Sequence, residues 1–453
     1  MTDSNPSDAH ELEESAALEG KALDVAELKE QWSGLAPEDR LAAFQALPAD
    51  EADDLFLGLS TREQYELLRH LPAGRRRIWV RLLPPDDAAD LIQECPEEER
   101  TWLLELLDDF TRAEVIGLLA YKEDAAGGLM NPRFARLRPE MTVDEAISYL
   151  RRQVGHVATI YYGYVLDPDQ RLLGVASFRE LFTGDRNALV RDVMRTDFIF
   201  VGEEMDQEAV AKLFSEHRLL AVPVVDAGGH IKGIVTADDI VDVVKEEAGE
   251  DIQKLGGLEV LTGPYMETKF GQMVRKRGGW LAVLFFGEMF TATAMAYFED
   301  EIARAVVLAM FIPLIISSGG NSGSQAATLV IRAMAVGEVR LRDWWRVMRR
   351  EVLTGLMLGG ILGTIGFVRI ELWQAAFRLY GEHSLFVALT VGVSLVAVVM
   401  WGTLSGSMLP FLLRGLGLDP ATASAPFVAT IVDVSGLVIY FTVASLILRG
   451  TLL

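Results

Sequence analysis

The stretch PFVATIVDVSGLVIY, residues 426–440, decides the class of this chain. It stays apolar through Leu448, so it is long enough to cross the hydrocarbon core of a bilayer as a helix. One carboxylate, Asp433, lies inside it. An acidic side chain at that depth costs roughly 2.5–3.5 kcal/mol on insertion scales, so such a residue usually faces water, a partner group or an ion. Thr430 and Ser435 bring further oxygens beside Asp433, which favours an ion site over a hydrogen bond made for helix packing alone.

A second apolar stretch, residues 304–333, contains the polar and glycine-rich run PLIISSGGNSGSQ at 313–325. Backbone of this kind is tolerated at membrane depth where it is buried in protein or lines a wet cavity, although small residues also serve plain helix packing. Asn321 and Gln325 are one helical turn apart and share one face of a helix. We therefore expect a broken helix here whose amides line a pathway. Glu288, in the first apolar stretch, is a second membrane carboxylate that suits pore lining and a helix contact equally.

Five hydrophobic stretches are present, and we expect each to span the membrane as a helix. They cover residues 279–298, 304–333, 352–374, 385–413 and 425–448. Basic residues gather before the first stretch and around the second connection, whereas the first connection is acidic. By the positive-inside rule the N-terminus is then cytosolic and, after an odd number of spans, the C-terminus is external. The basic residues are Arg275, Lys276, Arg277, Arg332, Arg340, Arg342, Arg346, Arg349 and Arg350.

The charge is divided unevenly along the chain, whose 453 residues have a formal net charge of -23. Residues 271–453 hold 14 Lys and Arg against 11 Asp and Glu, whereas residues 1–270 hold 28 against 54. An acidic surface of this size repels nucleic acid and attracts cations, which argues against a nucleic-acid partner. The single cysteine, Cys95, excludes an intrachain disulfide. The N-terminus lacks the basic and apolar regions of a secretory signal, so the acidic part is expected in the cytosol.

A short repeat begins at Leu35, after an acidic tail over residues 1–30. Two of its consecutive copies of equal length read LSTREQYELLRH and LPAGRRRIWVRL. Each copy opens with Leu (Cys95 once) and has apolar residues near its ninth and tenth positions, and the Pro, Ser or Asp followed by acids in most copies is typical of a helix start. Acids at these starts, such as Asp86, are interpreted as caps. The stacked helices predict an α-helical superhelical domain over 31–128.

A unit that reads strand, turn, strand and helix occurs twice, first at residues 167–181 and again at 226–240. The duplication resembles a tandem pair of cystathionine-β-synthase (CBS) domains. The resemblance implies two α/β domains, over 129–192 and 193–250.

The same resemblance raises the question of a nucleotide. In that superfamily the residues that match Thr236 and Asp239 often hold the ribose of an adenine nucleotide, which makes ATP a candidate cofactor. Capping of the following helix by Thr236 is an equally good interpretation. The first copy has Ser177 and Glu180 at these positions, which weakens a nucleotide site there.

Several motifs of the membrane part resemble the signatures of the MgtE family of bacterial magnesium channels and transporters. They are the run 313–325, the segment GLDP at 417–420, Pro426, and VDVSG at 432–436. The resemblance covers nearly the whole chain and implies a linking (plug) helix over 251–278 and a five-helix pore domain over 279–453. The chain departs from the usual pattern in the serines of the run 313–325, where glycine and threonine variants are common, and the chemistry stays similar.

The resemblance also implies a homodimer in the bacterial inner membrane, with one pore on its two-fold axis. Two Asp433 side chains, with the Ala429 carbonyl nearby, would then hold a hydrated or partly hydrated Mg²⁺. This suits the ion, which is small, requires octahedral oxygen geometry and keeps several waters. The residues expected to line the same pore are Asn321, Gln325, Thr430 and Glu288.

The acidic charge of residues 1–270 suggests how such a pore is gated. We hypothesise that cytosolic Mg²⁺ bridges acids of the N domain, the CBS domains and the linking helix and holds the pore closed, and that repulsion between the acids opens it when Mg²⁺ falls. The candidate ligands, chosen by resemblance and acidity, are Asp90, Glu216, Asp226, Glu246, Glu247, Glu250, Asp251, Glu259 and Asp419.

Two alternatives remain open. One is a secondary transporter of other divalent cations such as Co²⁺ or Mn²⁺, coupled to H⁺ or Na⁺. The other is a membrane-anchored nucleotide sensor, although an anchor would not need Asp433 and Asn321 at mid-depth. An enzyme is not expected, because the sequence has no P-loop, no HExxH motif and no Gly-x-Ser-x-Gly elbow.

Overall fold

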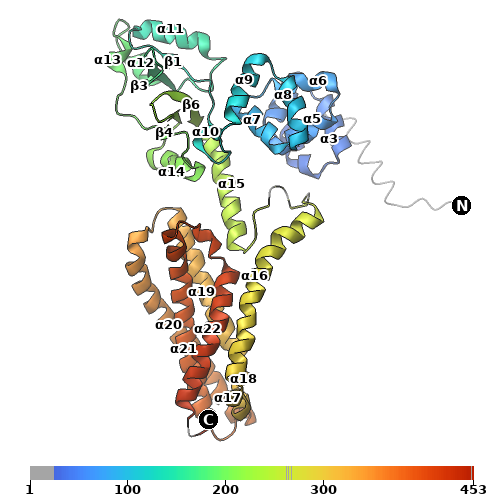
Figure 1. Cartoon of the computed structure of the whole chain (residues 1–453), viewed down its shortest axis with the longest axis vertical. Helices are drawn as coiled ribbons and strands as arrows, with labels where there is room; N and C mark the ends of the chain where they lie inside the picture. The colour runs from blue at the N-terminus through green and yellow to red at the C-terminus, as the bar shows by residue number, and fades with distance from the viewer. Residues whose placement is uncertain (1–24, 262, 264, 267, 450, 453) are drawn as a thin grey trace, which may run out of the picture. The chain divides into compact units, whose positions relative to one another are not determined.

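The computed structural model describes residues 25–261, 263, 265–266, 268–449 and 451–452, and the chain divides into two compact units, Met1–Lys245 and Glu246–Leu453. Figure 1 shows the elements in chain order. The first unit holds a helical N domain and two α/β CBS units, and the second holds long apolar helices. The expected fold class is therefore confirmed. Most of the predicted acidic tail lies outside the described residues.

Each copy of the short repeat forms one helix of the N domain. The leucine that opens a copy lies between two helices and is buried, as at Leu59, Leu71 and Leu83. Alternate helices pack together, α5 on α7 and α7 on α9, so each helix gains the apolar partner that it lacks alone. The helices are α2 (Val25–Gln31), α3 (Pro37–Ala46), α4 (Ala49–Leu57), α5 (Thr61–His70), α6 (Ala73–Val80), α7 (Pro85–Glu94), α8 (Glu97–Leu106) and α9 (Asp109–Leu118), with the 3-10 turn η1 (Trp32–Gly34) after α2.

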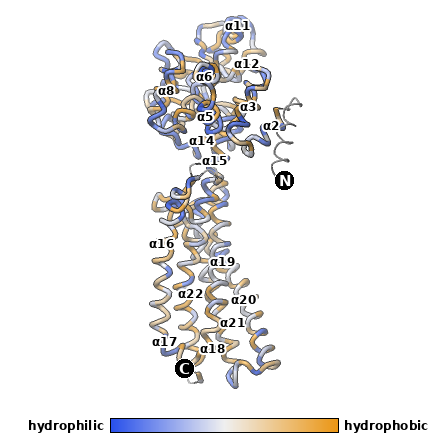
Figure 2. The backbone as a smooth tube through the Cα atoms, turned by 90° about the vertical axis from the view of Figure 1, so that its right-hand side faces the viewer, coloured by the Kyte–Doolittle hydropathy of each residue, from blue (hydrophilic) through white to orange (hydrophobic). Residues whose placement is uncertain are grey.

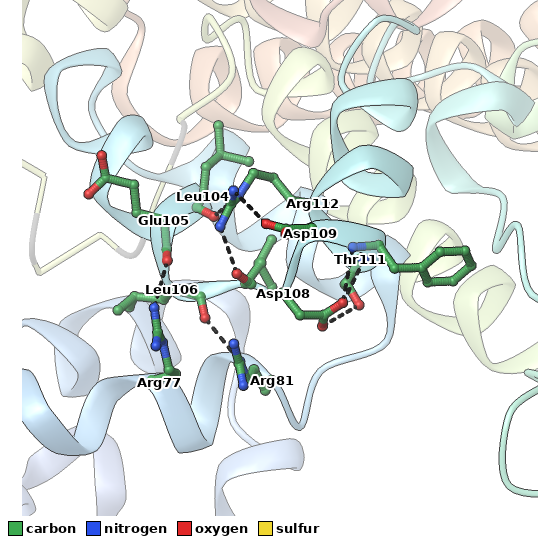
Figure 3. A network of polar contacts seen from close by, with 11 residues as sticks. Arg77, Arg81, Leu104, Glu105, Leu106, Asp108, Asp109, Thr111 and Arg112 are labelled. Carbon is green, nitrogen blue, oxygen red and sulfur yellow. Dashed lines mark hydrogen bonds and ion pairs between the residues drawn. The ribbon is translucent and has the colours of Figure 1, made fainter.

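Arginine side chains close the C-terminal end of α8 (Figure 3). Arg77 of α6 donates to the Glu105 carbonyl at 3.2 Å, and Arg112 of α9 donates to the Leu104 carbonyl at 2.7 Å. The last carbonyls of a helix have no partner inside it, and a cation there also interacts favourably with the helix macrodipole. These contacts tie α6 and α9 to the end of α8.

The two CBS units share one topology, with sheet orders β1-β2-β3 and β4-β5-β6. In each sheet the first pair of strands is parallel and the second is antiparallel. The second sheet shares a core with the N domain, because Val210 and Val235 belong to the same buried cluster as Leu91. The strands are β1 (Arg136–Leu137), β2 (Tyr162–Leu166), β3 (Leu172–Ser177), β4 (Val201–Gly202), β5 (Ala221–Val225) and β6 (Ile231–Thr236). The helices are α10 (Ala126–Leu129), α11 (Val143–Gln153), α12 (Phe178–Thr183), α13 (Val190–Val193), α14 (Gln207–His217) and α15 (Ala237–Leu255).

Five helical segments of the second unit are long and apolar enough to cross a membrane, as the sequence predicts. Figure 2 shows the hydrophobic colouring along most of their length. They are Phe270–Tyr297 (α16), Val306–Ala335 (α18, Val306–Ala309, and α19, Ile312–Ala335), Leu341–Phe377 (η2, Leu341–Asp343, and α20, Trp344–Phe377), Ser384–Gly415 (α21) and Ala425–Ile447 (α22). The short elements α17 (Glu299–Arg304) and η3 (Pro420–Thr422) lie in the connections.

The glycine-rich run 313–325 does not break its helix, so the expectation of a broken helix is wrong. α19 is continuous from Ile312 to Ala335. Its glycines pack against α21, where a Cβ on Gly323 would lie 2.9 Å from the Gly402 carbonyl oxygen. Ser322 and Thr403 share a 2.7 Å hydrogen bond at the same contact. The small and polar residues thus let two helix backbones approach closely.

Residues 251–278, expected as one linking helix, are divided between two helices. α15 runs through Leu255, and α16 begins at Phe270 and continues into the first span. Gly257 follows the end of α15 with φ +70°, a left-handed conformation that favours glycine after a helix. The turn after α15 therefore depends on this residue.

Candidate pore site and acidic clusters

Asp433 is half-buried on α22, next to two other helices of the second unit. Its carboxyl lies close enough to that of Glu288 on α16 for the two acids to influence each other. On the side of α19, a Cβ added to Gly320 would lie 3.7 Å from Asp433 Oδ1 and 3.5 Å from the Ala429 Cβ. Glycine at this position therefore leaves open the space beside Asp433 and Ala429.

Glu288 reaches Asp433 because α16 and α22 pack closely. A Cβ on Gly287 would lie only 2.8 Å from the Thr430 Cγ2, so a larger residue there would push the helices apart. Glu288 is exposed in the single chain, and no residue of the apolar segment of α16 is buried. A carboxylate exposed at membrane depth requires water, a partner or an ion. This face of α16 and α22 is therefore unsuited to lipid.

The other residues predicted to line a pore lie on α19 and α22. Asn321 and Gln325 are both exposed on α19, and Asn321 Nδ2 donates to Ser317 Oγ at 3.4 Å. The Thr430 hydroxyl donates to the Pro426 carbonyl of its own helix at 3.0 Å, which leaves its oxygen able to accept from a hydrated ion.

Ser435, which the sequence also placed beside Asp433, belongs to a helix contact. Its hydroxyl donates to the Ile431 carbonyl at 2.6 Å and accepts from Trp401 Nε1 of α21 at 2.7 Å. The second of these bonds holds α22 on α21. Ser435 is therefore not part of the group around Asp433.

Within the described part of the chain, no three His, Cys, Asp or Glu side chains are arranged to hold a bare metal ion. The acids occur as pairs and open clusters. Mg²⁺ keeps several of its waters and binds through one or two carboxylates, whereas Ca²⁺ takes six to eight oxygens.

Five aspartates of the first unit gather where the N domain meets the second CBS unit, and we call them the α7–α15 acidic cluster. They influence one another electrostatically across the two helices. The members are Asp86 and Asp87 at the start of α7 and Asp238, Asp239 and Asp242 at the start of α15. The sequence alone does not predict this cluster, because each acid, viewed alone, resembles a helix cap.

Burial and like charge favour protonation of the cluster. Asp86 is only 8% exposed and accepts a hydrogen bond from Asn131 Nδ2 at 2.9 Å. Burial, with repulsion from Asp239 and Asp87, raises the pKa of Asp86 well above its ordinary value. Burial also raises the pKa of Asp239 to about 6, despite hydrogen bonds from Thr236 that lower it. A cation near these groups would relieve the repulsion.

Thr236 and Asp239 bond to each other. The Thr236 hydroxyl and backbone amide both donate to Asp239 Oδ2, at 2.6 and 3.0 Å. Ser177 and Glu180 form a full capping box in the first CBS unit, where Arg195 also pairs with Glu180. In this structure the two pairs of residues thus bond internally at the starts of α15 and α12.

Both carboxylate oxygens of Asp226 have partners within or beside the β5–β6 turn. One of its carboxylate oxygens accepts from the Gly228 and His230 amides at 2.8 and 2.9 Å, and the other lies 3.1 Å from Lys232 Nζ. These hydrogen bonds, that of the His230 amide foremost, hold the pKa of Asp226 well below its usual range. The residue closes the β5–β6 turn and has little capacity left for an ion.

The end of α15 carries a second acidic group, around Lys254. The Lys254 ammonium pairs with Glu250 and lies 2.6 Å from Asp419 Oδ2. Burial, together with the charge of Asp419, raises the pKa of Asp251. We call Glu250, Asp251 and Asp419 the α15–α22 acidic group.

The remaining candidate ligands are spread over other surfaces. Glu246 and Glu247 lie on α15 one turn before Glu250. Glu259 pairs with Lys276 at 3.1 Å. Asp90 on α7 and Glu216 on α14 are exposed.

Comparisons with known proteins cover nearly the whole length of the chain. The family described as "Divalent cation transporter" (MgtE) matches residues 312–443, the "MgtE intracellular N domain" matches 23–124, and the CBS domain matches 126–185 and 190–246. The magnesium transporter MgtE of Thermus thermophilus is 41% identical over 422 residues, 92% of each chain. That of Enterococcus faecalis is 31% identical over 93% of this chain and 98% of its own. A crystal structure of the cytosolic domain of the Mg²⁺ channel MgtE with ATP is 38% identical over 52% of this chain and 98% of that one, with a TM-score of 0.47.

Proposed function

This chain belongs to the MgtE family of magnesium transporters, and on this premise we propose that it conducts Mg²⁺ through a pore that cytosolic Mg²⁺ closes. It is a membrane protein with an intracellular N domain, and a transporter, not an enzyme. The finer proposal is a Mg²⁺-selective channel in the bacterial inner membrane. Five spans after a cytosolic N domain would leave the C-terminus outside.

The pore proposal rests on one observation, the carboxyl groups of half-buried Asp433 and exposed Glu288 side by side on two apolar helices. In a homodimer with α22 near the two-fold axis, each Asp433 would approach its twin. A divalent cation that keeps most of its waters would balance these charges, with the carboxylates accepting hydrogen bonds from the bound waters. Oxygens of Ala429, Thr430 and Asn321 would be further acceptors. Glu288 would add charge to the same site.

The gating proposal rests on the two acidic groups of the cytosolic part. Mg²⁺ bound at the α7–α15 acidic cluster would hold the N domain on the second CBS unit. Mg²⁺ at the α15–α22 acidic group would hold the end of α15 on the connection before α22. Glu246, Glu247, Glu259, Asp90 and Glu216 remain candidates for further ion contacts, whereas Asp226 is not proposed, because its turn uses its oxygens.

Nucleotide binding is a separate proposal. A relative's cytosolic domain has been crystallised with ATP. In this chain an adenine nucleotide at the second CBS unit would have to compete for Asp239 with the Thr236 hydroxyl. Binding of ATP at millimolar concentration, lost in Asp239→Asn, is the expected result.

The decisive experiment compares wild type with Asp433→Ala in a bacterium that lacks its own magnesium uptake. Wild type should restore growth at low Mg²⁺, and Asp433→Ala should not. Glu382→Ala is the matched control, because it removes an exposed acid from the loop between α20 and α21. Equal rescue by all three at equal membrane expression would contradict the pore assignment. Current without coupled H⁺ or Na⁺ movement in proteoliposomes would separate a channel from a secondary transporter of other divalent cations such as Co²⁺ or Mn²⁺.

A further inference from the structure

Residues 332–350, which cover the end of α19, its connection to α20 and the first turns of α20, concentrate positive charge in an otherwise acidic protein. All six arginines of this segment are exposed. Among residues 332–350, all of which the structure describes, one ion pair occurs, Arg346 to Asp343 at 3.7 Å, and the Arg346 side chain is still 87% exposed. The six are Arg332, Arg340, Arg342, Arg346, Arg349 and Arg350. Most of this charge thus has no ion pair within that segment.

The charge continues into an apolar stripe on one face of α20. Arg346, Arg350, Leu353, Met357 and Ile361 follow one another at intervals of three or four residues, so they share one helical face. The three apolar side chains are 58%, 72% and 57% exposed. This face of α20 is therefore basic in the first turns of the helix and apolar in the turns that follow.

The opposite face of α20 is the one that packs on the bundle. Gly355, Gly359 and Gly363 are buried there, and a Cβ on Gly359 would lie 2.8 Å from the Val396 Cα of α21. The basic and apolar stripe thus faces away from the rest of its unit. It is a surface that the single chain leaves for something else to cover.

Two tryptophans indicate where this surface lies relative to the headgroup layer of a bilayer. Trp344 and Trp345 begin α20, both are exposed, and their rings form an edge-to-face pair at 5.6 Å. Exposed tryptophans at the end of a span favour the headgroup layer of a bilayer. With a rise of about 1.5 Å per residue, the arginines at 346–350 lie within roughly 10 Å of them.

We propose that this stripe of α20 binds an anionic phospholipid of the cytosolic leaflet. The guanidinium groups of Arg346, Arg349 and Arg350 hold the phosphate headgroup, for which the planar fork of arginine is suited. One acyl chain lies along Leu353, Met357 and Ile361. The order of chemistry along the stripe, cationic and then apolar, matches that of the lipid. The proposal does not depend on the transport assignment.

The test uses the full-length protein in detergent, titrated with phosphatidylglycerol or phosphatidylcholine and followed by thermal unfolding and native mass spectrometry. Phosphatidylglycerol should raise the thermal unfolding midpoint of wild type and stay bound in the native mass spectrum. Phosphatidylcholine should do neither. The triple variant Arg346→Gln/Arg349→Gln/Arg350→Gln should bind phosphatidylglycerol roughly tenfold to a hundredfold more weakly. Arg378→Gln, at the other end of the same helix, is the matched control and should behave as wild type.

Each of several outcomes would overturn the proposal. One is an equal response of wild type to both lipids. Another is a triple variant that binds phosphatidylglycerol as wild type does, and a third is a change in oligomeric state instead of lipid affinity, since a second copy would then cover the stripe. If the triple variant does not fold, Arg346→Gln and Arg349→Gln are measured singly. Each should weaken binding several-fold, and more at low salt than at high salt.

Discussion

The Lys254 ammonium lies 2.6 Å from the Asp419 carboxylate, which ties the last turn of α15 to the connection that leads into α22. Asp419 uses its other oxygen to cap η3, where it accepts from the Ala421 amide at 2.8 Å. Burial opposes the charge on Lys254, but the hydrogen bonds that its ammonium donates to Asp419 and Glu250 raise its pKa above the ordinary range. The helix that leaves the CBS pair thus contacts the element preceding the proposed pore helix through a charged bond.

Removal of this bond should change regulation more than stability. In Lys254→Met the α15–α22 acidic group loses its internal cation, so its acids repel until Mg²⁺ replaces the ammonium. We expect a several-fold change in the Mg²⁺ concentration that inhibits transport, and a coupling of about 1 kcal/mol in a double-mutant cycle with Asp419→Asn. Additive effects of the two substitutions would contradict a functional link.

The stability of the cytosolic part should rise as the pH falls from 7.5 to 5.5 in Mg²⁺-free buffer. The pKa values of Asp86 and Asp87 are raised in the folded state and that of Asp239 is about 6, so the folded state binds protons that the unfolded state does not hold above pH 4. The repulsion is therefore present at neutral pH and is relieved as the pH falls through about 6. The groups that face one another are those of the α7–α15 acidic cluster, together with Asn131 and Thr236.

The matching variant is Asp239→Asn, which should flatten this pH dependence. Two pH units of raised pKa correspond to roughly 3 kcal/mol at most. Saturating Mg²⁺ should also flatten it in wild type, because the cation replaces the protons. Thermal unfolding between pH 5.5 and 7.5 with and without Mg²⁺ provides the measurement, and a pH dependence unchanged by Asp239→Asn would contradict the assignment.

Glu288→Gln should weaken cation binding in the pore without abolishing transport. The substitution keeps the shape of the side chain but removes a charge from the neighbour of Asp433. We expect Mg²⁺ flux into proteoliposomes to need a several-fold higher Mg²⁺ concentration, whereas Asp433→Asn should reduce flux more than tenfold. Glu382→Gln serves as the control. A Glu288→Gln protein with the flux of wild type at every concentration would assign Glu288 to helix packing.

Gly323→Ala should destabilise the bundle, because the added Cβ would lie 2.8 Å from Val428 Cγ1 and 2.9 Å from the Gly402 carbonyl oxygen. Overpacking of this kind costs about 1–3 kcal/mol. Gly360→Ala on α20 is the control, since nothing lies within 4 Å of its added Cβ. The thermal midpoints in detergent should separate the two variants, and equal midpoints would contradict the close α19–α21 contact.

Asp226→Asn should weaken the β5–β6 turn and leave the inhibition of transport by Mg²⁺ unchanged. The amide lacks the charge that pairs with Lys232 and accepts fewer hydrogen bonds than the carboxylate. The measurement is the Mg²⁺ inhibition curve beside that of Asp239→Asn. A shifted curve for Asp226→Asn would return Asp226 to the regulatory sites.

Much of the fold follows from local sequence patterns. The five spans follow from the length of the apolar runs, the superhelix from a short repeat, and the CBS pair from a duplicated strand–turn–strand–helix unit, since each property depends on neighbours along the chain. The same local reasoning placed Asp433 in a span and proposed it for the pore. It went wrong at 313–325, where glycines that suggested a broken helix prove to be the contact surface of an unbroken one.

The tertiary structure decided which of these residues meet. Asp86 and Asp239 are far apart in the sequence and become neighbours only when α7 packs near the start of α15. Glu288 reaches Asp433 because Gly287 lets α16 approach α22. The hydropathy of a segment and the spacing of its apolar residues determine that a helix forms and which side of it is apolar, because both are local properties of the sequence. The partner that covers a face depends on packing summed over the whole chain, and no local pattern encodes it.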